Sequence, residues 1–347
     1  MPKVLVVGSA EKSNGGVSSV IKLMKKMPVW DEYSCYWLGT QMQGNYIKKT
    51  WYAIKANIMA LFIIWTYDIV HFHTTPDKLG LLIQLPILLL AKLGNKKTII
   101  HIHVGNQLNN HTKNALFKWW LNHCDLVVVL AKKWQQLLKD KYKDIKTPIK
   151  VIYNATDYRT FVPYEERQKY IVYVGSLNPN KAPYLLIKAW AMIHSKYPEW
   201  HIKFMGGSVL LEDSKQMAND LGIKDSVEFL GFCKGDVLVE NFSKASIYVM
   251  TSYNEGFPMS VIEAWAYGLP VVSTPVGGLP DVIEVGRNCL TFDFGNYNQL
   301  ADRLSVLIEN QKLRKTMSTY SRDFVYNNFS LEKISKDIKN VYRQLLT

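Results

Sequence analysis

The stretch Glu255-Gly-Phe-Pro-Met-Ser-Val-Ile-Glu263, followed by Ala-Trp-Ala-Tyr-Gly268-Leu-Pro-Val-Val-Ser-Thr, predicts a loop, a helix and a buried strand in succession. Pro258 suits a first helical turn, because its missing N–H would have no partner there. Gly268 is expected to end the helix. A helix N-terminus offers free N–H groups and partial positive charge, which suits an anionic or hydroxyl-rich ligand. Glu255 and Glu263 could accept hydrogen bonds from sugar hydroxyls, although capping by Glu255 and a simply exposed Glu263 would also explain the pair.

The length of 347 residues favours two domains, and an apolar content of 48% is ample for two cores. The four cysteines have no C-x-x-C spacing, which argues against a zinc site or a disulfide framework and fits a reducing cytosol. The N-terminus resembles a first strand rather than a signal peptide. The longest apolar runs, Ala56–Trp65 and Leu79–Ala91, fall short of the roughly 20 residues of a membrane span. We therefore expect a cytoplasmic protein without a transmembrane segment.

The net charge of +13 is confined to the first half of the chain. Residues 1–162 carry 22 Lys and Arg against 9 Asp and Glu, while residues 163–347 carry 20 of each. A nucleic-acid surface, an anionic membrane surface and simple solubility are three explanations for this excess. Bulky apolar residues are interleaved with lysines at Lys48–Trp65, Lys113–Trp120 and Lys132–Lys143. Such helices suit peripheral attachment to the cytoplasmic face of a membrane, and the alternative is that their aromatic residues pack in the core.

Strand-like segments alternate with helical ones along both halves, which is typical of parallel sheets covered by helices on both faces. We predict two doubly wound, Rossmann-like α/β domains, at residues 1–162 and 163–329, with a polar linker near Pro163–Lys169. The last helix, 330–347, is expected to pack back on the first domain. The predicted strands are 3–8, Ser34–Leu38, Asp68–His73, Lys97–Val104, Asp125–Leu130, Lys150–Tyr153, Tyr170–Val174, His201–Met205, Val227–Phe229, Ile247–Thr251, Val271–Ser273 and Cys289–Phe292.

Ligands of such sheets bind beyond the carboxyl ends of the strands, so the residues after each strand are candidate site residues. In the first half, Gly15 and Gly16 stand between a strand and a helix, which is a phosphate-binding arrangement. Two adjacent glycines could also only permit a tight turn.

Four histidines end two neighbouring strands of the first half, at His71, His73, His101 and His103, with each pair on one face of the sheet. No acidic residue clusters with them in the sequence, so we expect them to line the site entrance or to pack, rather than to bind a metal. His103 is best placed to point at a ligand.

In the second half, Lys181 lies in a turn rich in Asn and Pro, just before a helix whose first turn is marked by Pro183. A cation beside a helix N-terminus is unfavourable unless an anion sits between them, so Lys181 is a candidate phosphate ligand. An exposed loop lysine is the alternative. The stretch Pro275–Asp281, with Gly277 and Gly278, predicts another glycine turn that enters a helix.

Taken jointly, these motifs resemble those of the family-4, retaining glycosyltransferases with the GT-B fold, over nearly the whole chain. The resemblance rests on Glu255 to Glu263 as an E-x7-E motif, on Gly277-Gly278-Leu-Pro-Asp281, on Gly15-Gly16-Val17 and on Asn154-Ala-Thr-Asp157. It implies two Rossmann-like domains that face a central cleft, a nucleotide-sugar donor linked to UDP or GDP, and a hydroxyl acceptor. We expect that acceptor to be a glycan or glycolipid, such as a lipid-linked or surface-polysaccharide precursor.

The resemblance also implies roles for single residues. Glu255 would contact the donor sugar, Glu263 would hold the ribose, and Lys181 would neutralise the departing diphosphate with help from Gly16. His103 would face the transferred sugar. The backbone of Gly256, Phe257, Pro258 and Met259 would lie near the sugar and phosphate. Ser176 stands where the family often has an arginine, so one diphosphate-binding charge is missing.

The resemblance implies retention of anomeric configuration, and the sequence has no Asp-x-Asp to hold Mg²⁺, so we expect neither a metal nor another cofactor. Two acids across a scissile bond would suit a glycosidase, but the phosphate loops would then lack a purpose. A sugar-nucleotide epimerase of the same fold and a basic nucleic-acid-binding protein are the remaining alternatives. The nucleic-acid hypothesis rests on the high pI alone, and we expect no nucleic-acid partner.

Overall fold

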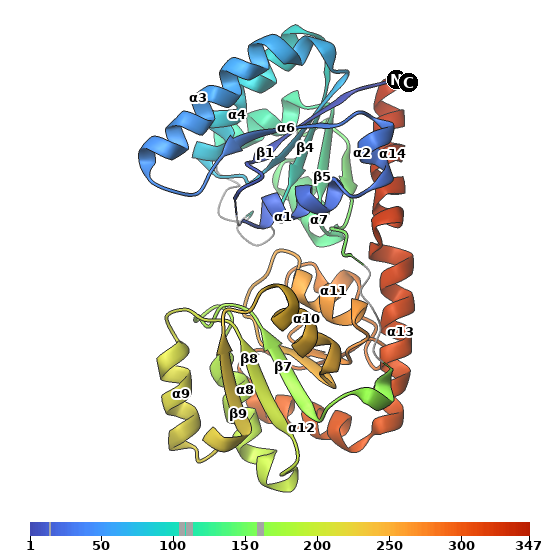
Figure 1. Cartoon of the computed structure of the whole chain (residues 1–347). Coiled ribbons are helices and arrows are strands. Elements are labelled where there is room, and N and C mark those ends of the chain that lie inside the picture. Colours follow the sequence, from blue (N-terminus) through green and yellow to red (C-terminus); the bar gives the residue numbers. More distant parts are fainter. Residues whose placement is uncertain (14, 104–107, 109–113, 158–162) are drawn as a thin grey trace. The chain divides into compact units, whose positions relative to one another are not determined.

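The computed structural model describes all residues except 14, 104–107, 109–113 and 158–162. The chain forms two compact units, which we call unit 1 (Met1–Ala155 and Phe329–Thr347) and unit 2 (Thr156–Asn328). Each unit is built around one six-stranded parallel sheet with helices packed against it (Figure 1). The predicted fold class, two Rossmann-like α/β domains, is confirmed.

The sheet of unit 1 has the strand order β2-β1-β3-β4-β5-β6. The strand β2 pairs with one side of β1 and all later strands lie on the other side, so the strand order reverses between β1 and β3. Alternate residues of its strands, such as Val4, Val6 and Ile69, form a core with helices α1, α2 and α14. Helices α3, α4 and α6 cover the other face, where Phe72 packs edge-on against Trp120. The elements are β1 (Val4–Ser9), α1 (Gly16–Met24), α2 (Pro28–Glu32), β2 (Tyr36–Gln41), α3 (Tyr46–Ile63), β3 (Ile69–Thr74), α4 (Lys78–Leu93), β4 (Lys97–Ile102), α6 (Ala115–His123), β5 (Leu126–Val129), α7 (Lys132–Lys141), β6 (Ile149–Val151) and α14 (Leu331–Leu346).

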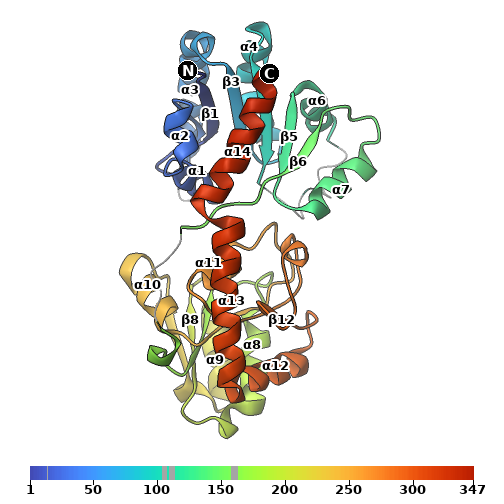
Figure 2. The same ribbon diagram turned by 90° about the vertical axis from the view of Figure 1, so that its right-hand side faces the viewer.

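The C-terminal helix α14 is part of the unit 1 core (Figure 2). Ser335 accepts a hydrogen bond from the backbone N–H of Val29 at 2.9 Å. The rings of Tyr33 and Tyr342 pack edge to face at 5.1 Å. These contacts tie the last residues of the chain to the helix that follows α1.

The sheet of unit 2 has the strand order β12-β11-β10-β7-β8-β9, which reverses between β10 and β7. Ile171 and Tyr173 of β7 pack with α8 and α12 in the main core, while Tyr248 stacks on Phe242 of α10 on the other face. The elements are β7 (Tyr170–Val174), α8 (Pro183–Ile193), β8 (His201–Met205), α9 (Leu211–Asp220), β9 (Val227–Gly231), α10 (Gly235–Lys244), β10 (Ile247–Met250), α11 (Met259–Ala266), β11 (Val271–Ser273), β12 (Cys289–Thr291), α12 (Tyr297–Glu309) and α13 (Gln311–Phe329).

Two local predictions are corrected by the structure. The strand expected at Ser34–Leu38 is β2, Tyr36–Gln41, because the unpredicted helix α2 is followed by a turn in which Ser34 has φ of 40°. The helix expected after Gly277-Gly278 is a single 3₁₀ turn, Leu279–Asp281. The turn ends there because the Asn288 side chain binds the backbone that follows it, donating to Val282 O and accepting from Glu284 N.

Helix α6 begins at Ala115, where the side chain of Asn114 caps it, and residues 109–113 before it lie outside the described residues. None of the four cysteines, all of which lie in described segments, forms a disulfide. Across the described residues, no helix combines the length and the apolarity needed to cross a membrane.

Candidate functional site

Several loops of unit 2 meet at the carboxyl end of its sheet, where the strand order reverses. The loop after β7 is joined to the loop after β10, because Asn180 O accepts from Tyr253 N at 2.7 Å and Asn180 Nδ2 donates to Asn254 O at 2.9 Å. The same loop is joined to the loop after β8, where Leu177 N donates to Gly207 O at 3.2 Å. The point of strand reversal is where open α/β sheets bind ligands.

Lys181 is held at the start of α8 by its backbone. The Asn178 side chain accepts a hydrogen bond from Lys181 N at 3.0 Å, and Ala182, with φ of 45°, turns the chain into the helix at Pro183. Lys181 Nζ forms an ion pair with Glu255 Oε1 at 2.5 Å, and the two side chains are 25% and 14% exposed. In this structure, Glu255 is therefore the anion that offsets the Lys181 cation beside the helix N-terminus.

The glycine turn after β11 presses against the backbone of the Glu255 loop. Gly277 has φ of 64°, and a Cβ there would lie 2.4 Å from Glu255 O and 2.8 Å from Gly256 O. Gly278 N donates to Gly256 O at 2.9 Å. Glycine is required at 277 both by its backbone conformation and by this close approach.

The helix α11 begins after Pro258 and ends before Gly268, whose φ is 69°. Its other residues from Val261 to Ala266 are buried, and Glu263 is the half-buried exception. Burial is the main cause that raises the pKa of the Tyr248 phenol, and the charges of Glu255 and Glu263 raise it further. The two carboxylates therefore lie near the same buried ring of β10.

The remaining donor-site candidates of unit 2 surround this pair. Gly256 and Met259 are half-buried, Phe257 and Pro258 are buried, and Ser176 is exposed on the loop after β7. Exposed Ser176 leaves room for a larger side chain.

Two further polar residues of this site were missed by sequence reasoning. Ser252 Oγ and Asn254 Oδ1 are buried, and neither atom has a hydrogen-bond partner among the described residues. Buried polar groups without partners are rare in folded proteins and often await a ligand or water. Their position directly after β10 was the available signal, because ligands of such sheets bind beyond the carboxyl ends of the strands.

In unit 1, the loop after β1 leads into α1 through Gly15 and Gly16. Gly15 has an extended backbone, with φ of −89° and ψ of 163°, which any residue can adopt. A Cβ at Gly16 would meet no described atom within 4 Å. Neither glycine has a backbone conformation that requires glycine in this structure.

The buried His71, His73 and His101 and the half-buried His103 form one cluster in unit 1. His73 Nδ1 lies 2.8 Å from His103 Nε2, and His71 Nδ1 lies 2.8 Å from the hydroxyl of Tyr342 on α14. Burial lowers the pKa of the His103 imidazole to about 3 and lowers the pKa values of the other three well below 6.5. The cluster is therefore uncharged at neutral pH. Residues 104–107, which follow His103, lie outside the described residues.

The potential metal ligands among the described residues are His71, His73 and His101, whose nitrogens are spread over up to 4.8 Å. Two nitrogens on one zinc ion would lie roughly 3.4 Å apart. The rings of His71 and His101 are stacked with an interplanar angle of 6°, which does not direct their nitrogens at a common point. As arranged here, the residues do not fit a tetrahedral metal ion.

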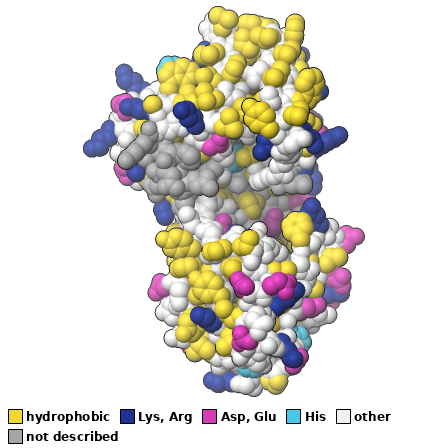
Figure 3. Space-filling view, turned by 90° about the vertical axis from the view of Figure 1, so that its left-hand side faces the viewer, with side chains coloured by type: hydrophobic (Ala, Val, Ile, Leu, Met, Phe, Trp, Pro, Cys, Tyr) yellow, Lys and Arg dark blue, Asp and Glu magenta, His cyan; other side chains and the backbone are white. Residues whose placement is uncertain are grey.

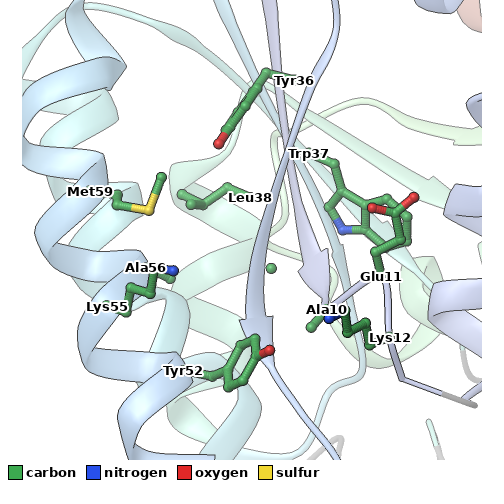
Figure 4. Close-up of a pocket in the computed structure, with 11 residues that line it drawn as sticks. Ala10, Glu11, Lys12, Tyr36, Trp37, Leu38, Tyr52, Lys55, Ala56 and Met59 are labelled. Atoms are coloured by element: carbon green, nitrogen blue, oxygen red, sulfur yellow. The ribbon is translucent and has the colours of Figure 1, made fainter.

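A separate pocket of about 260 Å³ lies in unit 1 between α3, the edge strand β2 and the loop after β1 (Figure 4). Aromatic rings and two lysines line it. Its lining residues are Ala10, Glu11, Lys12, Tyr36, Trp37, Leu38, Gly39, Tyr52, Lys55, Ala56 and Met59.

Two Rossmann-like sheets, with a lysine, two glutamates and glycine loops at a strand-reversal point, define the class of nucleotide-utilising α/β enzymes. Comparison with known proteins identifies the family within that class. The glycosyl transferases group 1 model matches residues 154–324, and the glycosyltransferase family 4 model matches residues 43–159. The chain belongs to the family-4-type glycosyltransferases and is a glycosyltransferase.

An individual relative agrees with this assignment, and solved structures share the fold. An uncharacterized glycosyltransferase of Haemophilus influenzae is 28% identical, over 76% of this chain and 74% of that protein. The Anabaena protein HepE, solved in complex with UDP, superposes with a TM-score of 0.78 at 18% identity, over 99% of this chain and all of that one. The lipopolysaccharide outer core galactosyltransferase WaaB superposes with a TM-score of 0.73 at 19% identity, over 99% of each chain.

Proposed function

We propose that this glycosyltransferase moves a sugar from a nucleotide-diphosphate sugar to an acceptor hydroxyl, with retention of anomeric configuration and without a metal ion. The observation that carries the proposal is the Lys181–Glu255 ion pair at the point of strand reversal in unit 2. A lysine supplies the charge that a diphosphate needs, and a glutamate supplies acceptors for sugar hydroxyls. The HepE complex with UDP supports a nucleotide ligand.

The chemistry requires that negative charge be stabilised as the anomeric C–O bond breaks. Lys181 and the N–H groups at the start of α11 would take the departing diphosphate, as a metal does in other enzymes. Glu255 would accept hydrogen bonds from the sugar hydroxyls, and Glu263 would hold the ribose. The backbone of Gly256–Met259 would lie beside the sugar and phosphate.

We propose that Gly16 and His103 of unit 1 take part in the same reaction. Gly16 would offer its N–H to the diphosphate, since it is the first residue of α1 and lies at the helix N-terminus. His103 is neutral at neutral pH, so it would offer the transferred sugar a hydrogen bond rather than a charge. The acceptor hydroxyl would attack the oxocarbenium-like sugar on the face the diphosphate leaves, which gives retention.

We further propose that the acceptor is a lipid-linked or surface-polysaccharide precursor. The fold likeness to WaaB, which acts on the lipopolysaccharide outer core, is compatible with such an acceptor. The aromatic pocket of unit 1 supports it as well, because aromatic rings pack well against the apolar faces of sugars.

The proposal is tested with a panel of UDP- and GDP-sugars, in which binding is measured by calorimetry and hydrolysis by release of nucleotide. Glu255→Gln removes the negative charge that holds Lys181. We expect it to weaken the binding of the intact nucleotide sugar while strengthening the binding of the free nucleoside diphosphate a few-fold, because Lys181 is released to the phosphates.

The matched control is Glu284→Gln, which breaks an exposed ion pair with Arg287 in the same unit and should change neither affinity. EDTA should leave turnover unchanged, and the product anomer should match the donor anomer by NMR. Failure of every nucleotide sugar to bind, or a loss of diphosphate affinity in Glu255→Gln, would contradict the proposal.

A further inference from the structure

Helix α3 turns its large apolar residues away from the protein. A stripe that recurs every three or four residues is exposed, and its members are Ile47, Trp51, Ile54, Ile58 and Leu61, with Trp65 continuing it in the 3₁₀ turn Ile64–Thr66. Phe62, beside this stripe, is 75% exposed. The buried face of the helix carries Ala56 and Ala60 instead. A helix that packs only against its own domain has the reverse pattern.

The neighbouring helix α4 repeats this arrangement. Leu79, Leu82, Pro86, Leu89 and Leu93 are exposed at the same spacing, and Leu93 is 73% exposed. A groove of about 370 Å³ between the two helices is lined chiefly by Ile58, Leu61, Pro86, Leu89 and Leu93. We call these exposed residues of α3 and α4 the apolar face. Figure 3 shows hydrophobic side chains gathered on this side of unit 1.

The two helices are firmly joined, so the apolar face is a built surface. The side chain of Asn57 on α3 donates to Ala53 O at 2.8 Å within its own helix and to Ile83 O of α4 at 3.0 Å. Contiguous apolar surface of this kind is unusual on a protein that has no partner for it.

The other basic aromatic stretches of unit 1 do not share this property. Trp120 on α6 and Trp134 on α7 are buried in the core, and Trp119 on α6 is half-buried. Of the two explanations open at the level of the sequence, core packing holds for α6 and α7, and α3 presents its aromatic residues to solvent.

The charged residues of α3 and α4 indicate which partner the apolar face would bind. Neither 46–63 nor 78–93 contains an Asp or Glu, while Lys48, Lys49, Lys55 and Lys78 lie within them, and Lys92 is paired with Asp125 at 2.8 Å. A second copy of the chain would bring lysines against lysines, which disfavours a symmetric dimer through this face. An anionic bilayer complements both properties, because it accepts apolar side chains below its headgroups and attracts the lysines.

We infer that α3 and α4 dock unit 1 on an anionic lipid surface, with the apolar face inserted at the depth of the headgroups and the lysines on the phosphates. Tryptophans at Trp51 and Trp65 suit that depth. Because Tyr52, Lys55 and Met59 of the same helix line the pocket in Figure 4, docking would bring that pocket to the lipid surface. This last step rests on the proposed function and supports a lipid-linked acceptor.

The test is co-sedimentation of the full chain with phosphatidylcholine vesicles that contain or lack phosphatidylglycerol. We expect binding to the anionic vesicles, weaker binding at high salt, and at least roughly a tenfold loss of binding in the Trp51→Ser/Phe62→Ser variant. Phe232→Ser is the matched control, because Phe232 in unit 2 is also 75% exposed. It should bind vesicles as the wild type does.

Donor binding separates this inference from the proposed function, since the Trp51→Ser/Phe62→Ser variant should bind the nucleotide with unchanged affinity. No binding of the wild type to either vesicle would overturn the inference. So would equal binding of wild type and Trp51→Ser/Phe62→Ser, or concentration-dependent dimers in sedimentation that this variant abolishes, which would identify a second copy as the occupant.

Discussion

We expect Gly277→Ala to disrupt the candidate site, although Gly277 itself has no side chain that could contact a ligand. An alanine there must adopt φ of 64°, which costs about 1–2 kcal/mol for a residue with a Cβ. The new methyl group would also lie 2.4 Å from Glu255 O and 2.8 Å from Gly256 O, so backbone must move. Overpacking of this kind costs about 1–3 kcal/mol. The sum predicts a loss of about 2–5 kcal/mol in the free energy of unfolding, with the Glu255 loop displaced.

The control for this change is Gly286→Ala in the same unit. Gly286 has φ of 81°, but a Cβ there would meet no described atom within 4 Å, so it imposes the backbone strain without the clash. Urea unfolding should show Gly277→Ala to be less stable than Gly286→Ala by about 1–3 kcal/mol. Calorimetry with the preferred nucleotide sugar should show at least roughly tenfold weaker binding for Gly277→Ala alone. Equal stability and equal donor affinity in the two variants would refute the reasoning.

Two further predictions concern charged groups, an added arginine in unit 2 and a buried histidine in unit 1. Ser176→Arg should tighten the binding of the nucleoside diphosphate about tenfold in calorimetry, because Ser176 is exposed and a charged hydrogen bond is worth about 1.5 kcal/mol; unchanged affinity at low salt would contradict this. Burial lowers the pKa of His101 below 6.5, so the unfolded state binds more protons and stability falls as the pH drops below about 6.5, by up to about 1.4 kcal/mol per pH unit per histidine. His101→Asn should therefore make the decline of the melting temperature between pH 6.5 and 5 shallower, whereas His201→Asn, which alters an exposed histidine, should not; identical slopes would show that His101 is not the group that titrates.

The strands and the loops that follow them could be predicted because their signals are local. Tyr170–Val174, His201–Met205 and Val271–Ser273 match β7, β8 and β11 residue for residue. Each is an apolar run bounded by turn residues, and the hydrophobic pattern together with those turn residues is enough to place a strand. The prediction of a helix after Gly277 was wrong, because the end of this turn depends on Asn288, a residue seven positions beyond it. The side chain of Asn288 donates to Val282 O and accepts from Glu284 N.

The orientation of α3 could not be predicted for a different reason. Its sequence contains apolar residues on nearly every side, so the pattern alone does not say which side faces the sheet. The small residues Ala56 and Ala60 are the ones that pack inward, because a close helix-to-sheet approach leaves no room for Trp51 or Phe62. Volume rather than hydrophobicity selected the buried side, and volume matching is a property of the packed structure.

The contact between Lys181 and Glu255 depends on strand order, which no local signal contains. The two residues are 74 positions apart in the chain and follow β7 and β10, strands that do not succeed each other in sequence. The loops that follow β9 and β12 leave the two edges of the same sheet, yet in sequence they look as suitable as the central ones. Only the reversal of strand order between β10 and β7 makes the loops after these two strands neighbours at the place where such sheets bind ligands. Sequence reasoning could select residues by their position after strands, whereas the long-range pairing of the strands decided which of them meet.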